Sequence, residues 1–373
     1  MRPPEMHTED QGCVCECVEE CRPDGHRHLH TRLRLCSVCS YWFLLMAWLI
    51  YTSLELVIAM ACCLGNVLVV WAVCLRRTFR QTTFCFVASL AVADFLVGAV
   101  AVPLAVLVDG WVEIPFQACL AVSCVVLVLT QASVLSLLAI AVDRYLRVSI
   151  PLRYKEIATE QRSWIAVVLC WLISCLLGFT PLFGWHNGDS QSSLLQNSSH
   201  INCTFLAVIS LPYMVYFNYL GCILLPLAAM TLLYALVFYS LRKRLRREDQ
   251  TKLRAFLIKE KRLARSLALV LLLFAACWMP LHLMNCVLLS TGPQGVPQTA
   301  FYAGILLSHA NSAVNPVVYA LRIAKIREAY LEIWRRYVLC WRGQGDFSSS
   351  SWRSQPGEPN TGHQMTFPSN TGT

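Results

Sequence analysis

Long uncharged, hydrophobic stretches recur along most of this chain. They contain no Asp, Glu, Lys or Arg, or are interrupted once, and they cover residues 56–75, 81–108, 114–142, 163–188, 190–241 and 266–321. A helix that crosses a bilayer needs about 20 mostly apolar residues, so each stretch is long enough to span a membrane. The fifth stretch opens with a polar loop before one helix from about Pro212, and turn-forming residues at 291–297 split the last into two helices. The pattern therefore predicts an all-α membrane protein, a bundle of seven transmembrane helices.

The positions of the basic residues predict how this bundle is oriented. Beyond residue 40, Lys and Arg occur only at 76–80, 144–162, 242–265 and from Arg322 onward, and the alternate loops contain none. Because Lys and Arg near helix ends stay on the cytoplasmic side, we expect the amino terminus outside a plasma membrane and the carboxyl terminus inside. The composition agrees, since 56% of the residues are hydrophobic and 14% are charged, against roughly 45–50% and 25% in soluble domains. The net charge of +9 is therefore assigned to the cytoplasmic membrane edge and not to nucleic acid.

Both ends of the chain are expected to lie outside the bundle of residues 46–321. Residues 1–45 are rich in cysteine, but their spacing matches no metal site, and Met46 can serve as a natural start. This segment is expected to be either an extracellular extension or absent from the mature protein. Residues 322–340 predict an amphipathic eighth helix on the inner membrane surface, with Cys340 as a palmitoylation site. Residues 341–373 are expected to form a disordered cytoplasmic tail.

Two carboxylates, Glu55 and Asp94, fall within the predicted spans. An ionisable group in the hydrocarbon layer costs on the order of 2.5–3.5 kcal/mol on insertion scales, so each calls for a functional explanation. Asp94 is mid-span, and Pro280 and Pro316 permit bends in the sixth and seventh helices, as a two-state switch requires. The alternative for either carboxylate is a neutral acid bonded to a neighbouring helix. Other mid-span polar residues that could face Asp94, as cation ligands or in a hydrated network, are Asn66, Ser133, Asn311, Ser312 and Asn315.

Short motifs at the helix ends are specific only in combination. The tripeptide 143–145 (Asp-Arg-Tyr) closes the third span, the sixth contains 277–280 (Cys-Trp-Met-Pro), and the seventh contains 315–319 (Asn-Pro-Val-Val-Tyr). With Cys119 and Trp171, these make residues 48–338 resemble a rhodopsin-class G-protein-coupled receptor. The resemblance implies a Cys119–Cys203 disulfide, in a loop that also has glycosylation sequons at Asn197 and Asn202. It implies switch residues at Trp278, Pro280, Asp143, Arg144, Tyr145, Asn315, Pro316 and Tyr319.

Neutral polar residues at the outer helix ends indicate an uncharged ligand. Val126 stands where amine receptors have an aspartate, and the seventh span lacks a Lys for retinal. An Asn amide can pair with the N6 and N7 edge of adenine, which suits Asn285, and Phe205 can stack on a flat ring. Ser308 and His309 can bond ribose hydroxyls, with Glu55 holding His309. The alternative for such polar groups is that each is satisfied against a neighbouring helix.

Longer strings resemble the adenosine receptors, at residues 66–73, 89–94, 137–154, 213–218 and 308–312. Leu206 and the sequence at 304–312 resemble the third subtype of this family, whereas His282 matches the other subtypes better. The resemblance implies allosteric sodium as the sole bound ion, at Asp94, Ser133, Asn311 and Asn315, and no other cofactor. It implies adenine contacts at Phe205 and Asn285, apolar walls at Leu281 and Ile305, ribose partners at Thr130, Ser308 and His309, and further ligand-site positions at Asn218, His282 and Glu55.

The same resemblance implies a receptor and not an enzyme. Adenosine would bind the active arrangement of the bundle more tightly and shift the equilibrium toward it. The basic stretch 242–265 and Arg144 would then meet a G protein of the inhibitory class that lowers cyclic AMP, and arrestin and receptor kinases would act on the tail. One other hypothesis is an orphan receptor of the same class for another neutral small molecule or a lipid. Another is a seven-helix enzyme or proton carrier, but Glu55 and Asp94 are separated by neutral groups.

Overall fold

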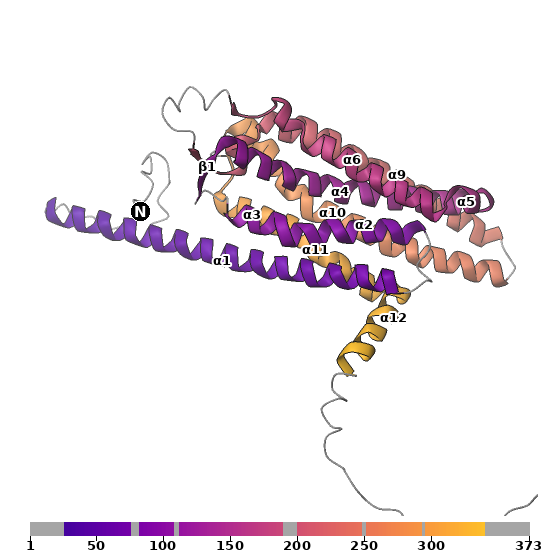
Figure 1. Ribbon diagram of the computed structural model, residues 1–373. Coiled ribbons are helices and arrows are strands. Elements are labelled where there is room, and N and C mark those ends of the chain that lie inside the picture. Colours follow the sequence, from indigo (N-terminus) through magenta and orange to yellow (C-terminus); the bar gives the residue numbers. More distant parts are fainter. Residues whose placement is uncertain are drawn as a thin grey trace, which may run out of the picture.

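The computed structural model describes residues 26–75, 82–107, 112–188, 200–247, 251–292 and 295–339. Long helices lie side by side in one bundle, with α1 along one edge (Figure 1). In chain order, the helices of the seven predicted spans are α1 (His26–Leu75), α2 (Thr82–Leu96) continued by the π-helical η2 (Val97–Ala101) and α3 (Val102–Leu107), α4 (Phe116–Ser149), α6 (Glu160–Gly178), the π-helical η4 (Tyr213–Leu224) continued by α9 (Leu225–Arg247), α10 (Thr251–Thr291) and α11 (Gln298–Arg322).

Shorter elements connect these helices. Two strands, β1 (Glu113–Pro115) and β2 (His200–Asn202), pair antiparallel next to the start of α4. At this same end of the bundle lie the 3₁₀ turn η3 (Thr180–Phe183) and the single helical turn α8 (Phe205–Val208). At the opposite end, α5 (Pro151–Ile157) follows α4, and α11 leads into α12 (Ala324–Ile333) and the π-helical η6 (Trp334–Leu339). We call the first the disulfide end, after the bridge described below, and the second the basic end.

Six of the long helices in the described part of the chain are long and apolar enough to cross a membrane by length and composition. They are those of the first six predicted spans. The seventh, α11, is 25 residues long and packs against α1 and α10. Its hydropathy is lowered by polar side chains that face the bundle interior, among them His309, Asn311 and Asn315, all of which are buried. The seven-helix bundle predicted from the sequence is therefore present.

Side chains divide between the interior and the outer surface as a membrane protein requires. The main core cluster draws buried residues from all seven spans and from α12, and includes Leu90, Ile140, Phe274 and Tyr319. Large apolar side chains lie exposed along the outer faces of α1 and α6, including Leu64 and Leu176. Such a surface would be unfavourable in water, because contiguous exposed apolar patches are rare on soluble monomers.

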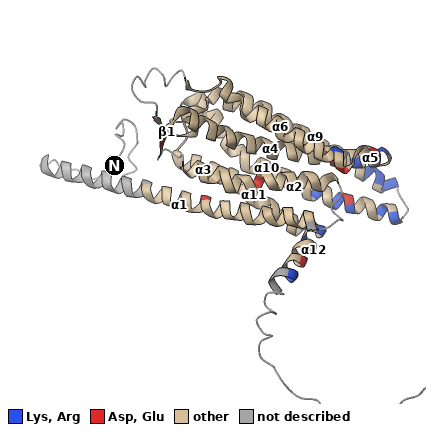
Figure 2. Cartoon of the chain, in the orientation of Figure 1, with Lys and Arg blue, Asp and Glu red and all other residues tan. Residues whose placement is uncertain are grey.

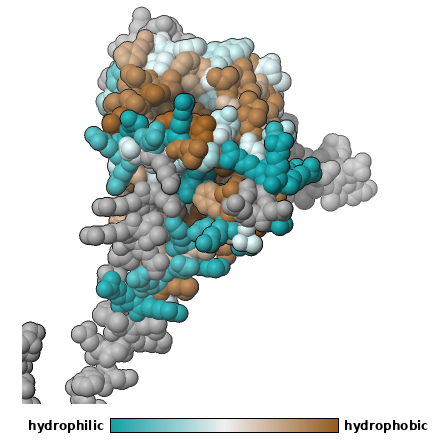
Figure 3. All heavy atoms as spheres, turned by 90° about the vertical axis from the view of Figure 1, so that its right-hand side faces the viewer, coloured by the Kyte–Doolittle hydropathy of each residue, from teal (hydrophilic) through white to brown (hydrophobic). Residues whose placement is uncertain are grey.

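Charged side chains gather at one end of the bundle. Lys and Arg lie around the ends of α9, α10 and α12 and around α5, whereas the middle of the bundle carries almost none (Figure 2). Seen end-on, this face has hydrophilic side chains spread between hydrophobic patches (Figure 3). The basic loops that alternate with uncharged ones along the sequence therefore meet at one end of the bundle.

Two features near the chain ends differ from the simplest expectation. α1 begins at His26, so residues 26–45 continue the helix of the first span; a separate extracellular extension remains a prediction. In α12, Ile326 and Ile333 are buried in the main core, whereas Leu331 and the first residue of η6, Trp334, are exposed. The apolar face of the predicted eighth helix is thus partly covered by the bundle itself, because α12 packs against α1 and α11.

Candidate functional site

A disulfide ties the β1–β2 pair to α4. Cys119, in the first turn of α4, is bonded to Cys203, which directly follows β2, with 5.7 Å between their Cα atoms. The backbone N–H of Cys203 also donates to the carbonyl of Val112 (3.2 Å). The bridge predicted by resemblance is confirmed, and it holds the chain leading into α8 against the disulfide end of the bundle.

α8 directs two side chains into a cavity between the helices. Phe205 and Leu206, its first two residues, both line this cavity. The turn is capped by Thr204, whose hydroxyl oxygen accepts from the backbone N–H of Ala207 (3.3 Å).

The cavity has a volume of about 150 Å³ and is lined mainly by apolar and aromatic side chains. Every ligand-site residue predicted from the sequence lines it except Glu55, which lies behind His309. Its remaining walls come from α1, α3, α4, η4, α10 and α11. The residues lining it are Tyr51, Ala105, Val122, Ser123, Val126, Leu127, Thr130, Phe205, Leu206, Met214, Asn218, Trp278, Leu281, His282, Asn285, Phe301, Ile305, Ser308 and His309.

One side of the cavity combines an aromatic ring, an amide and aliphatic walls. Asn285 is 2% exposed, and its carboxamide oxygen has no hydrogen-bond partner among the described residues. Buried polar atoms are nearly always paired, so an unpaired one that lines a cavity points to a ligand or to water. Phe205, Leu281 and Ile305 line the same cavity.

The α11 side of the cavity carries hydroxyl and imidazole groups. The Ser308 hydroxyl donates to the carbonyl of Ile305 (2.7 Å), and the Thr130 hydroxyl donates to the carbonyl of Val126 (3.0 Å). Each donor is thus satisfied within its own helix and not, as the alternative interpretation expected, against a neighbouring helix. Each oxygen can still accept from a ligand. His309 is oriented by Glu55, whose two carboxylate oxygens both lie 2.9 Å from Nδ1 of the imidazole.

His282 lines the cavity next to two aromatic rings. Its ring lies between Tyr219 (4.9 Å between centroids) and Trp278 (5.8 Å). Neither of its nitrogens has a hydrogen-bond partner among the described residues, and Nε1 of Trp278 has none either. Gln131 donates from Nε2 to the carboxamide oxygen of Asn218 (2.9 Å), which leaves the amide hydrogens of Asn218 available.

Asp94 lies deeper in the bundle and is fully buried among neutral donors. Its oxygens accept from Ser312 (2.8 Å), Asn315 (2.7 Å) and Ser133 (3.5 Å). Asn311 is also buried, but no hydrogen bond joins it to Asp94. No cluster of three or more His, Cys, Asp or Glu occurs among the described residues, so any ion here would rely on one carboxylate and neutral oxygens.

At the basic end, the Asp143–Arg144 motif forms a buried ion network. Asp143 accepts from Thr82 and Tyr154, both at 2.7 Å. Arg144 pairs with Asp143 (2.7 Å) and with Glu260 of α10 (3.1 Å). Burial, reinforced by the Asp143 carboxylate, raises the pKa of the Tyr154 phenol above its usual value, so this side chain remains a hydrogen-bond donor.

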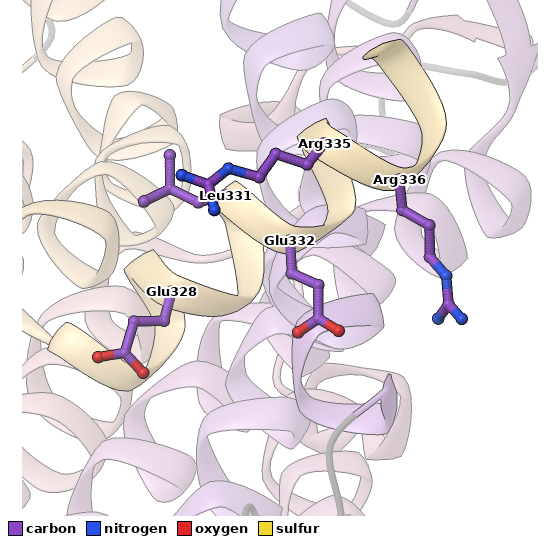
Figure 4. Close-up of a pocket in the computed structure, with 5 residues that line it drawn as sticks. All are labelled: Glu328, Leu331, Glu332, Arg335 and Arg336. Carbon is purple, nitrogen blue, oxygen red and sulfur yellow. The ribbon is translucent and has the colours of Figure 1, made fainter. Parts of the chain in front are cut away.

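A wide, open hollow lies along α12, outside the bundle (Figure 4). It measures about 750 Å³ and is lined by Glu328, Leu331, Glu332, Arg335 and Arg336, all from one helix. With a single helix as its wall, it lacks the enclosure typical of small-molecule sites, which bury most of the ligand. The cavity at Asn285 is therefore the candidate ligand site.

Comparisons with known proteins agree with this geometry. The model of the 7 transmembrane receptor (rhodopsin family) matches residues 65–319. The chain is 46% identical to adenosine receptor A3 of Ovis aries over 292 residues, which is 78% of this chain and 91% of that protein. It is 45% identical to adenosine receptor A3 of Bos taurus over 79% of this chain and 92% of that protein.

The chain belongs to the rhodopsin family of seven-transmembrane receptors, among the adenosine receptors. It is a multi-pass membrane receptor and not an enzyme.

Some residues of this receptor's sites were not singled out in the sequence. Glu260 and Tyr154 complete the Arg144 network, yet each looks like an ordinary residue of a basic, helical stretch. Ser312 donates the shortest hydroxyl contact to Asp94, although the resemblance implied Asn311 in the ion site. The sequence had already placed Ser312 among the mid-span polar residues that could face Asp94.

The predicted modification sites lie mostly beyond the described structure. Asn197, Cys340 and the tail 341–373 fall outside the described residues. Asn202 is exposed on β2, and its glycosylation stays a prediction.

Proposed function

We propose that this receptor binds adenosine in the cavity lined by Phe205 and Asn285. The observation that carries the proposal is the buried, unpaired carboxamide oxygen of Asn285. The amine at N6 of adenine donates and N7 accepts, so one Asn amide can satisfy both atoms. Phe205 offers an aromatic face for the purine, and offset ring contacts contribute about 0.5–1.5 kcal/mol beyond burial. The names of the A3 relatives support the same ligand.

The opposite wall suits the ribose. Its hydroxyls both donate and accept, so they match the oxygens of Ser308 and Thr130, whose own hydrogens are already used. His309 adds an imidazole nitrogen that faces away from Glu55. Because Glu55 engages Nδ1, Nε2 is the nitrogen left for a ribose hydroxyl.

We further propose sodium as an allosteric ion at Asp94. The carboxylate is fully buried and meets only neutral partners, and an uncompensated buried charge is costly. Oxygen atoms from Ser133, Ser312 and the amides of Asn311 and Asn315 suit a small, hard cation. The amides would have to turn their oxygens inward, since Asn315 now presents its nitrogen.

Signalling is proposed to run from this cavity to an inhibitory G protein, which lowers cyclic AMP. Helix α10 links the cavity to the basic end, because it carries Trp278 at the cavity and Glu260 at the basic end. Pro280 lies in the same helix, between Trp278 and His282. The loop charges support an outside amino terminus and a cytoplasmic basic end, and the receptor family supports a plasma-membrane location. Arrestin and receptor kinases are proposed to act on the tail.

The test uses cells that display the receptor on their surface. A labelled adenosine analogue is displaced by unlabelled adenosine on membranes, and cyclic AMP is measured after its synthesis has been stimulated. Adenosine should displace the label and lower cyclic AMP, and Asn285→Ala should abolish binding with surface delivery unchanged. Unaltered affinity of Asn285→Ala would remove the adenine assignment. If the surface-expressed receptor responds to a lipid or another neutral molecule and to no nucleoside, adenosine is not its ligand.

A further inference from the structure

The segment that carries Phe205 has few hydrogen bonds of its own. α8 is four residues long. Its ends are bonded by the Thr204 cap and by the backbone N–H groups of Ala207, which donates to the carbonyl of Thr204 (3.1 Å), and Ile209, which donates to that of Phe205 (3.0 Å). One isolated helical turn is unstable, because fixing its dihedral angles costs more than its few bonds return. The disulfide anchors Cys203, but Thr204 lies between it and Phe205. Other groups must therefore hold the turn in place.

Asn187, from the segment after η3, supplies those groups. Its side-chain Nδ2 donates to the carbonyl oxygens of Leu206 (3.0 Å) and Ile209 (3.3 Å). Its backbone N–H donates to the carbonyl of Val208 (3.1 Å). The preceding residue, His186, forms an antiparallel bridge with Ile209. Asn187 is thus bonded to three of the carbonyls in the stretch that places Phe205 and Leu206 in the cavity.

The side chain of Asn187 does not itself line the cavity. Both hydrogens of its amide are used on backbone carbonyls, so it fixes the chain and not a ligand. Most other residue types could not replace Asn187 here. To bond two carbonyls three residues apart, a side chain of this length needs two donor hydrogens on one nitrogen.

We propose that Asn187 is a positioning residue for ligand binding: it sets the location of the Phe205 ring and of Leu206 without touching the ligand. This inference rests on the proposed function, because it takes the ligand to contact Phe205. It predicts that the affinity of this receptor depends on a residue outside its cavity, through one aromatic ring.

The first experiment compares two changes of amide to carboxylate. Asn187→Asp keeps the size of the side chain but removes both donors and places negative charge against two carbonyl oxygens. Losing two hydrogen bonds should lower the affinity for a labelled adenosine analogue about tenfold and speed its dissociation. Gln298→Glu is the matched control, since Gln298 is an exposed amide at the same end of the bundle that bonds Tyr302. It should leave affinity and dissociation unchanged.

A double-mutant cycle with Phe205→Ala separates positioning from a general structural effect. If Asn187 acts through Phe205, Asn187→Asp should add little loss in the Phe205→Ala background. An equal loss in both backgrounds, or no change in affinity and dissociation rate in either, would overturn the proposal while leaving adenosine binding intact. If Phe205→Ala itself leaves affinity unchanged, the stacking role and this inference both fail. Affinity is counted per receptor on the cell surface, and Asn187→Ala, which adds no charge, replaces the Asp variant if delivery is lost.

Discussion

Glu55 and His309 join α1 to α11 inside the bundle, with both carboxylate oxygens 2.9 Å from Nδ1 of the imidazole. Glu55 is fully buried and His309 is 7% exposed. One partner without the other would leave a buried polar group unsatisfied, which costs about 1–3 kcal/mol and more if it is charged. The pair therefore determines which nitrogen of His309 can face the ligand.

Replacing Glu55 should weaken adenosine binding in a graded way. Glu55→Gln keeps an oxygen that can accept from Nδ1, so affinity should fall less than about tenfold; Glu55→Ala removes it and should cost about 10- to 100-fold. Radioligand displacement on membranes measures both. Equal affinities for Glu55→Ala and the unmodified receptor would show that the orientation of His309 is irrelevant to the ligand.

Replacing Asp94 should remove sensitivity to sodium. If sodium favours the inactive arrangement, it lowers agonist affinity, and agonist must lower sodium affinity by the same factor. Asp94→Asn removes the carboxylate that accepts from Ser312 and Asn315, so agonist affinity should become independent of sodium concentration. The check is agonist displacement in sodium against a large organic cation at the same ionic strength.

A matched pair of serine variants tests the part played by Ser312 in the same site. Ser312→Ala removes an oxygen 2.8 Å from Asp94 and should shift the sodium effect to higher concentrations. Ser174→Ala is the control, because its buried hydroxyl donates within its own helix, to the carbonyl of Cys170.

Sodium sensitivity retained in full by Asp94→Asn would refute the ion site.

Neutralising Glu260 should raise signalling without ligand. One carboxylate oxygen of Glu260 forms an ion pair with Arg144 and the other with Arg147, both at 3.1 Å, and these pairs join α10 to α4. If this contact is made only in the inactive arrangement, weakening it by about 1.4 kcal/mol raises the ratio of active to inactive receptors about tenfold. Glu260→Gln should therefore raise basal nucleotide exchange on the G protein several-fold. Glu156→Gln changes an exposed carboxylate of α5 and should have no effect; equal basal activity in both variants would contradict the prediction.

Adding one methyl group at Gly178 should destabilise the bundle. A Cβ there would lie 2.6 Å from the backbone nitrogen and 2.7 Å from the Cα of Val128, so α6 could not stay as close to α4. Overpacking of this kind costs about 1–3 kcal/mol, and the thermal midpoint of purified receptor should fall by several degrees for Gly178→Ala. Gly221→Ala meets nothing closer than 3.9 Å and should leave the midpoint unchanged within error.

The sequence alone determined the class of fold and predicted a set of residues that the structure brings to one cavity. Lengths of uncharged sequence and the placement of Lys and Arg are properties of the chain itself, because a bilayer imposes them on any helix that crosses it. Neutral polar residues at the outer helix ends and the resemblance to the adenosine receptors together supplied the residues predicted to contact the ligand, and all but Glu55 line one cavity.

Only the tertiary structure decided how distant segments pair. Asn187 and Leu206 meet through a side chain and a carbonyl oxygen, and Arg144 meets Glu260 across 116 positions of sequence. Hydrophobic spacing specifies which face of a helix is buried, but the rotation and depth of one helix against another depend on the whole packed core. Hydrogen bonds are shorter-ranged still, so a shift of about 1 Å between elements makes or breaks them. That is why the predicted ligand-site residues other than Glu55 meet in one cavity, while the contacts of Asn187 with Leu206 and of Arg144 with Glu260 could not be predicted.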